Sequence, residues 1–168
     1  EKIEIGSLSD GTGIVIRVIR DGQIGISSTD NPAAWEQCLD AAIASARFSD
    51  RVDWKGLPSP AHLSKEPLAC DPAIQPEPEL LHDLIDRMMT GASSWPAEIT
   101  GGGVSVLTSS SINANSGGLY YETEATNVGL SLEMIAGRST GFEYDSSWRL
   151  DGVKPEWVGE QAAFFAAK

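Results

Sequence analysis

The two histidines are the side chains that first call for a search for metal or acid–base chemistry. His62 lies in a proline-rich stretch and His82 in a predicted helix, and neither belongs to an HExxH motif or a related zinc spacing. His82 and Asp86 are four residues apart and share a helix face. The pair could hold a weak metal contact, but we favour a polar face exposed to solvent. The sequence therefore predicts no metal site in this chain.

Serines and carboxylates offer two further routes to catalysis. Serines cluster at 109–111 and 146–147, but there is no GxSxG turn, no SxxK motif and no well-placed histidine to act as a base. Glu122 and Glu124 are two apart on a predicted strand and project from one face, as an acid–base pair or, as we favour, as an exposed acidic surface. We predict no catalytic residue, although a site assembled without any motif stays open as an alternative.

The glycine run Gly101, Gly102 and Gly103 precedes a predicted strand that begins near Val104. Phosphate-binding glycine loops instead follow a strand and open a helix, so a nucleotide site is disfavoured and a flexible entry into the strand is favoured. The low side-chain bulk of glycine also permits close approach of another backbone. The residues we single out as a surface for substrate or partner are Gly101, Gly102, Gly103, Asn113 and Asn115.

Composition sets limits on the class of protein. The 168 residues carry 24 acidic and 12 basic side chains, a net charge of −12 that disfavours direct nucleic-acid binding. No apolar run reaches the ~18 residues of a membrane span, and no signal peptide is visible, so we expect a soluble intracellular protein without membrane contact. Cys38 and Cys70 lack CxxC spacing and are predicted to be reduced and structural. We expect one domain over residues 1–168, cut at both ends from a longer protein.

The first elements that position these residues form a predicted β-meander with a helix packed on it. Its strands are the Ile3 to Ile5 alternation, the β-branched run of residues 13–19, which is typical of a central strand covered on both faces, and residues 23–28. Asp21 and Gly22 suit a tight hairpin. A helix follows, capped by Asp30 or Asn31, with one apolar stripe at Trp35, Leu39, Ala42, Ile43 and Ala46.

The rest of the chain predicts an irregular loop, two helices and several strands. Six prolines between residues 50 and 78 predict a surface-wrapping loop. The second helix has a stripe at Leu81, Leu84, Ile85 and Met88 and a stop at Gly91; the last begins at residues 154–156 and has Val158, Ala162 and Phe165 on one side. Strands are predicted at 100–108, 119–126, 128–135 and 139–144, with a glycine turn at 113–118. The fold class is α+β: a mainly antiparallel, twisted sheet with two or three helices packed on it.

This order of elements, with the run from Gly13 to Asp30 and the Thr100-Gly-Gly-Gly-Val-Ser-Val segment, resembles the N-terminal domain of the TldD/PmbA family, also called modulator of DNA gyrase proteins. The tail, with Asn113-Ala-Asn-Ser-Gly-Gly, Gly141-Phe-Glu-Tyr-Asp-Ser-Ser-Trp-Arg-Leu-Asp and Pro155-Glu-Trp-Val-Gly-Glu-Gln-Ala-Ala, is similar to the PmbA (TldE) branch. The resemblance covers nearly the whole chain.

The resemblance implies a non-catalytic N-terminal domain that is followed by a larger β-rich C-terminal domain, absent from this chain. It implies a cytoplasmic TldD–PmbA metallopeptidase complex that processes peptides and unfolded proteins, with zinc only in the HExxxH motif of a TldD-like partner. Our hypothesis is that this domain helps to form a chamber for an extended peptide, whose main chain adds to a strand edge at 104–111 or 119–126. The alternative is a regulatory protein-binding module, like a DNA gyrase modulator, without a role in proteolysis.

Overall fold

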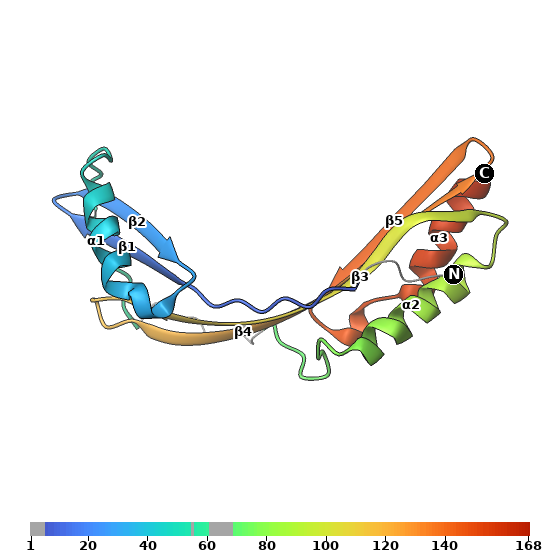
Figure 1. Cartoon of the computed structure of the whole chain (residues 1–168), viewed down its shortest axis with the longest axis horizontal. Helices are drawn as coiled ribbons and strands as arrows, with labels where there is room; N and C mark the ends of the chain where they lie inside the picture. The colour runs from blue at the N-terminus through green and yellow to red at the C-terminus, as the bar shows by residue number, and fades with distance from the viewer. Residues whose placement is uncertain (1–5, 55, 61–68) are drawn as a thin grey trace. The chain divides into compact units, whose positions relative to one another are not determined.

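The computed structural model describes residues 6–54, 56–60 and 69–168, and its contacts separate into two compact units that meet in sequence between Gly56 and Leu57. Both units combine antiparallel strands with α-helix, which confirms the α+β prediction (Figure 1). From the length of the chain we expect one domain. No feature noted in the sequence predicts the division between Gly56 and Leu57. Each unit is built around a sheet of its own.

The first unit is built on a hairpin of β1 (Ile14–Arg20) and β2 (Gln23–Thr29). Its turn uses Asp21 at φ 54° and Gly22 at φ 79°, the left-handed pair that the sequence predicts. The prediction that β1 is covered on both faces is wrong, because Val15 is 73% exposed and Arg17 on the same face is also exposed. The predicted strand at residues 3–5 lies outside the described residues.

A helix packs on this hairpin as predicted, through small residues rather than a bulky stripe. The 3-10 turn η1 (Pro32–Ala34), capped by the Asn31 side chain, leads into α1 (Trp35–Ala46). Its buried positions are Cys38, Ala42 and Ala46, whereas Trp35, at the start of the predicted stripe, is exposed. Gly25 of β2 lies under the helix, and a Cβ there would be 1.9 Å from the Ala42 carbonyl oxygen.

Two serines of the α1 region occupy the outer edge of β2. The Ser45 hydroxyl accepts a hydrogen bond from Ile26 N at 3.0 Å, and the Ser49 hydroxyl accepts one from Ile24 N at 2.9 Å. These two backbone donors point away from β1. The helix therefore closes the edge of the sheet on which it packs.

The second unit contains a three-stranded antiparallel sheet in the order β3-β4-β5. Its strands are β3 (Glu98–Ala114), β4 (Tyr120–Ala136) and β5 (Ser139–Ser147). The structure joins the predicted strands 119–126 and 128–135 into β4, so the predicted break at Asn127 is wrong. The reason is that alternation continues unbroken through that position, with buried side chains at Thr126, Val128, Leu130, Leu132 and Met134.

Two helices cover the face of the sheet that carries those buried side chains. They are α2 (Pro78–Ala92) and α3 (Pro155–Ala167), the latter preceded by the 3-10 turn η3 (Leu150–Gly152). Leu84 and Met88 of the predicted α2 stripe are buried, as are Val158 and Ala162 of α3. Phe165 was expected on the inner side of the last helix but is 48% exposed, because the buried stripe runs through Ala166 instead.

Glycines bring three backbones of this unit into direct contact. A Cβ on Gly91 of α2 would lie 1.9 Å from the Glu156 carbonyl oxygen, and one on Gly141 of β5 would lie 2.1 Å from the Ala162 carbonyl oxygen. The prediction that Gly91 ends the helix is wrong: α2 continues to Ala92, and Gly91 is a buried packing position. Because Gly91 has no side chain, the backbone of α3 can come close to α2 at this position.

The proline-rich stretch at 50–78 does more than wrap the surface. Within the first unit, Val52 N donates to the Gly22 carbonyl at 2.8 Å. Within the second unit, Ile74 is 1% exposed and belongs to the hydrophobic core. The described end of the stretch is thus a packed part of the second unit, while residues 61–68 lie outside the description.

Candidate functional site

The outer edge of β3 is the candidate site that the structure presents. At the β3–β4 turn, Asn115 N donates to the Leu119 carbonyl and Gly118, at φ 85°, donates to the Asn115 carbonyl, which is a three-residue loop with a glycine bulge. Ladder hydrogen bonds then alternate along the strand. The residues whose N–H and C=O groups point away from β4 are therefore Val104, Val106, Thr108, Ser110, Ile112 and Ala114. Within the described residues, none of these outer groups has a backbone partner.

This edge differs in composition from the rest of the chain. After Glu98, the remaining sixteen positions of β3 carry no charge. Many of its side chains are small and polar, and the large ones, Ile99, Leu107 and Ile112, are 38%, 61% and 67% exposed. The opposite edge of the sheet, β5, carries Glu143 and Asp145 within nine residues. The sheet thus has one charged edge and one long uncharged edge.

The glycine run lies inside β3 rather than ahead of it. The register shifts between Ile99 and Gly101, so the run begins at an irregularity in the β3–β4 ladder. Gly102 has φ 146°, and a Cβ there would lie 2.5 Å from the Ser131 carbonyl oxygen. Gly103 has open space around it. The run is therefore a bulge inside the strand and not a flexible entry to it. Gly102 is the position at which a side chain would clash with β4.

The two predicted asparagines lie at the opposite end of β3. The Asn115 side chain accepts from Gly117 N at 2.8 Å and donates to the Pro58 carbonyl at 2.9 Å, so it organises the turn. Asn113 donates to the Ser111 hydroxyl at 3.3 Å. At ~3.3 Å per strand residue, Asn113 lies roughly 30 Å from the glycine run. The structure therefore places the five predicted residues on one strand and its turn but does not bring them together.

The weaker candidates from the sequence occupy exposed positions. His82 and Asp86 are exposed on α2. Glu122 accepts from the Tyr120 hydroxyl, and this hydrogen bond raises the pKa of the tyrosine. Glu124 lies 3.9 Å from the Cys70 sulfur. These contacts make neither a paired carboxylate site nor an activated histidine.

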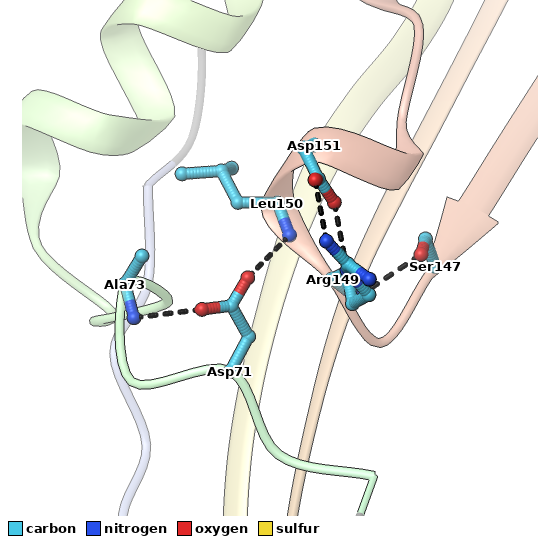
Figure 2. A network of polar contacts seen from close by, with 6 residues as sticks. All are labelled: Asp71, Ala73, Ser147, Arg149, Leu150 and Asp151. Carbon is cyan, nitrogen blue, oxygen red and sulfur yellow. Dashed lines mark hydrogen bonds and ion pairs between the residues drawn. The ribbon is translucent and has the colours of Figure 1, made fainter.

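A polar network that sequence reasoning missed ties the end of the proline-rich stretch to the turn η3 that follows β5 (Figure 2). The Asp71 carboxylate accepts from Leu150 N at 2.9 Å and from Ala73 N at 3.0 Å. These two backbone N–H groups, with a smaller contribution from Arg149, lower the pKa of Asp71. The Asp71-Pro72 pair is a turn signal that points to the bond from Ala73 N, whereas the bond from Leu150, 79 positions away, leaves no local signal.

Buried Thr126 joins the same network to β4. Its hydroxyl donates to the Trp148 carbonyl at 2.7 Å and accepts from Asp71 N at 2.9 Å, while Thr126 N donates to the Ala69 carbonyl at 2.9 Å. Because β5 ends opposite Val128, the segment from Ala69 continues along the β4 edge where β5 stops. The outer edge of β4 is thereby closed at this point.

An open groove of about 520 Å³ lies beside the network, lined by Arg87, Arg149, Asp71, Ala73, Leu150, Asp151 and Val153. Its two arginines are already paired: Arg87 with Glu156 at 2.6 Å and Arg149 with Asp151 at 2.6 Å. The ion pair raises the pKa of Arg87 and lowers that of Glu156. The groove therefore offers no uncompensated positive charge to an anionic ligand.

In the part of the chain that the structure describes, no three His, Cys, Asp or Glu side chains come together in a way that fits a metal ion. The zinc that the resemblance assigns to a TldD-like partner thus has no matching donor set among these residues. Likewise, no helix in the described ranges has the length and apolar character needed to cross a membrane.

Comparison with known families and structures gives consistent matches. The family model for PmbA/TldA metallopeptidase domain 1 matches residues 1–46, and the model for the PmbA/TldA metallopeptidase central domain matches residues 70–168. A search of curated protein sequences found no significant match.

Three solved structures share the fold. TldE from Thermococcus kodakarensis aligns with a TM-score of 0.80 at 21% identity, over 97% of this chain and 39% of that one. A protein from Thermotoga maritima, named for a proposed role as modulator of a DNA gyrase, aligns at 0.71 and 17% identity, over 93% and 37%. A similarly named protein from Bacteroides thetaiotaomicron aligns at 0.66 and 21% identity, over 89% and 38%. The chain therefore spans less than two fifths of the length of each.

Proposed function

Because the chain belongs to the PmbA/TldD family, we propose that it is a non-catalytic part of a PmbA- or TldE-like subunit in a cytoplasmic TldD–PmbA metallopeptidase complex. The observation that carries the proposal is the central-domain match over residues 70–168, supported by the TldE-like fold. Zinc chemistry belongs, in this proposal, to the TldD-like partner. The role of this chain is to contribute surface to the chamber that holds a peptide or an unfolded protein.

The open face of the second unit supports a role as chamber wall. Helices α2 and α3 cover one face of the sheet, and Leu107, Phe142 and Tyr144 are exposed on the other. The rings of Phe142 and Tyr144 stack with centroids 6.4 Å apart. Gly103 and Ser131 are cross-strand neighbours of Tyr144 in the same row, so small residues lie beside the aromatic pair. Such a surface exposes backbone and aromatic rings to an extended chain without steric obstruction.

Co-expression with the TldD-like protein of the same host tests the proposal. We expect the two full-length proteins to co-purify in near equal amounts and the rate or specificity of cleavage of an unfolded substrate to depend on both. A partner with its zinc-motif glutamate replaced is the control that assigns cleavage to that subunit. Identical cleavage by the partner alone would refute the proposal.

The same purification separates the regulatory alternative. Recovery of DNA gyrase without a TldD-like protein would favour a gyrase-binding module, as the names of two of the solved structures suggest for those proteins. Recovery of the peptidase partner without gyrase would favour the complex.

A further inference from the structure

We infer that the open face of the sheet in the second unit binds arginine side chains of a polypeptide ligand. The site consists of Glu133 on β4 and the aromatic pair Phe142 and Tyr144 on β5. The inference rests on the proposed function in one respect, which is that the ligand is a polypeptide. It adds the side chain that the surface selects and the residues that select it.

The three residues of the site are neighbours across two paired strands. Glu133 is directly opposite Phe142 and diagonal to Tyr144, so its side chain is within reach of both rings. The rings stack with 6.4 Å between their centroids and 29° between their planes. Leu132 and Met134, which flank Glu133 along β4, are buried in the core. Since side chains alternate along a strand, the site lies on the face away from α2 and α3.

This site is accessible to a ligand. Phe142 and Tyr144 are 58% and 64% exposed, and Glu133 is exposed as well. On the side away from the rings, Glu133 is opposite Gly101, and a Cβ on that glycine would be 3.8 Å from the Glu133 Oε2 atom. A Cβ on Gly103, in the row of Tyr144, would meet nothing within 4 Å. The carboxylate therefore has aromatic rings on one side and a floor without side chains on the other.

The charge of Glu133 has no counterpart among the residues that the structure describes. The ion pairs found in those ranges are made by other carboxylates, and no side-chain hydrogen bond reaches Glu133 there. Glutamate is disfavoured in strands, because it adds little to the packing of a sheet surface. Here it occupies the central strand of the three. A cation from a ligand would offset this charge.

The combination of a carboxylate with exposed rings favours arginine over other side chains. Aromatic faces attract cations, and guanidinium groups more often than ammonium groups. A guanidinium is planar, so it stacks on a ring and still donates two parallel hydrogen bonds to a carboxylate, whereas lysine presents a compact charge. The net charge of −12 attracts any basic segment, but this attraction is not specific to the site and is screened by salt.

The test uses the 168-residue chain and a fluorescent ten-residue peptide of Gly, Ser and Arg at 0.15 M salt. In the control peptide, citrulline replaces arginine and keeps its planar shape without the charge. We expect the citrulline peptide to bind at least about threefold more weakly, and a lysine peptide to lie between the two. Equal binding of the arginine and citrulline peptides would overturn the inference without any change to the protein.

Two matched pairs of variants locate the site. Glu133→Gln and Glu124→Gln remove the same charge from β4, but Glu124 is an odd number of positions from Glu133 and projects from the other face. We expect at least about a threefold loss of affinity for the arginine peptide with Glu133→Gln and a much smaller loss with Glu124→Gln. Equal losses would show that the overall charge attracts the peptide, which would overturn the inference.

The aromatic pair has its own control. Phe142→Ser should weaken binding of the arginine peptide by a similar factor. Tyr120→Ser removes a ring that is 59% exposed from the distant end of β4 and should leave the affinity unchanged. Thermal unfolding shows whether each variant folds, and Glu133→Gln alone decides the question if Phe142→Ser does not. Equal effects of the two ring substitutions in folded protein would count against the site.

Failure of this inference is distinguishable from failure of the proposed function, because peptide binding is measured without the TldD-like partner. Arginine-selective binding without co-purification of the partner would refute the proposed function alone. Co-purification without selectivity for arginine would refute this inference alone. Full-length protein in which Glu133→Gln leaves binding of the arginine peptide unchanged would show that another part of the protein covers the face, which would also overturn the inference.

Discussion

Gly159 of α3 lies directly against the Met88 carbonyl of α2: a Cβ on Gly159 would be 1.9 Å from that oxygen and 2.6 Å from Ala92 N. The relationship is reciprocal, since Gly91 of α2 meets the Glu156 carbonyl of α3 in the same way. Each helix thus fits a glycine against the backbone of the other. The packing of α2 against α3 therefore depends on the absence of a Cβ atom at Gly91 and at Gly159.

Gly159→Ala should therefore destabilise the second unit. Because the clash is with backbone rather than with a flexible side chain, the helices must move apart, and overpacking of this kind costs about 1–3 kcal/mol. Urea unfolding followed by circular dichroism measures the change. Gly103→Ala is the control, because a Cβ there meets nothing within 4 Å. Equal stability of the two variants would contradict the packing we describe.

Thr126→Val should also lower the stability of the second unit, for a different reason. Valine has the same shape but cannot accept the hydrogen bond from Asp71 N or donate to the Trp148 carbonyl. Leaving a buried polar group without a partner costs ~1–3 kcal/mol. Thr123, also on β4, is the control: Thr123→Val removes an exposed hydroxyl contact to Ser111 of β3 and should change the free energy of unfolding by less than ~0.5 kcal/mol. A similar loss in both variants would argue against the network.

Asp71 should make stability depend on pH. Its pKa in the folded state lies below the usual 3.8, because Leu150 N and Ala73 N donate to the carboxylate. The unfolded state therefore binds the proton more readily, so the stabilisation is complete above the unfolded pKa and is lost as pH falls through the folded one. Asp71→Asn should be less stable than wild type at neutral pH, and the difference should shrink towards acid. A difference independent of pH between 7 and about 3 would show that ionisation is irrelevant.

The Arg87–Glu156 pair should contribute little despite its bidentate geometry. The hydrogen bonds measure 2.6 and 3.1 Å, but both side chains are about half exposed. Exposed pairs of this kind couple by ~0.2–1 kcal/mol. A double-mutant cycle with Arg87→Met and Glu156→Gln measures the coupling, which should fall in 1 M salt because the Debye length drops to ~3 Å. Coupling well above this range would mean that the pair is better shielded than its exposure indicates.

Local chemistry explains which elements the sequence predicts well. The Asp21-Gly22 turn and the Asn31 cap depend on residues within a few positions, and both are found. The prediction of two separate strands at 119–126 and 128–135 is wrong, because the alternation of buried side chains continues past Asn127 within one strand, β4. The roles of Gly91 and Gly141 depend on segments distant in sequence, for which a single sequence contains no signal.

The candidate site shows the same division between local and distant information. The glycine run is visible in the sequence, and the hypothesis of a strand edge at 104–111 or 119–126 uses the close backbone approach that glycine permits. That β3 lies at the edge of the sheet is a matter of strand order, which the sequence does not determine. The Thr126 and Asp71 network joins three segments and was found only in the structure.

The glycine contacts also determine where the second unit should open last. The backbone of α3 touches that of α2 at Gly91 and Gly159 and that of β5 at Gly141, so α3 has main chain against it from two elements. Amide hydrogens in this layer should exchange with solvent only through global unfolding, whereas those at the outer positions of β3 should exchange within the folded state. The same sheet would then combine the slowest and some of the fastest exchanging amides of the unit.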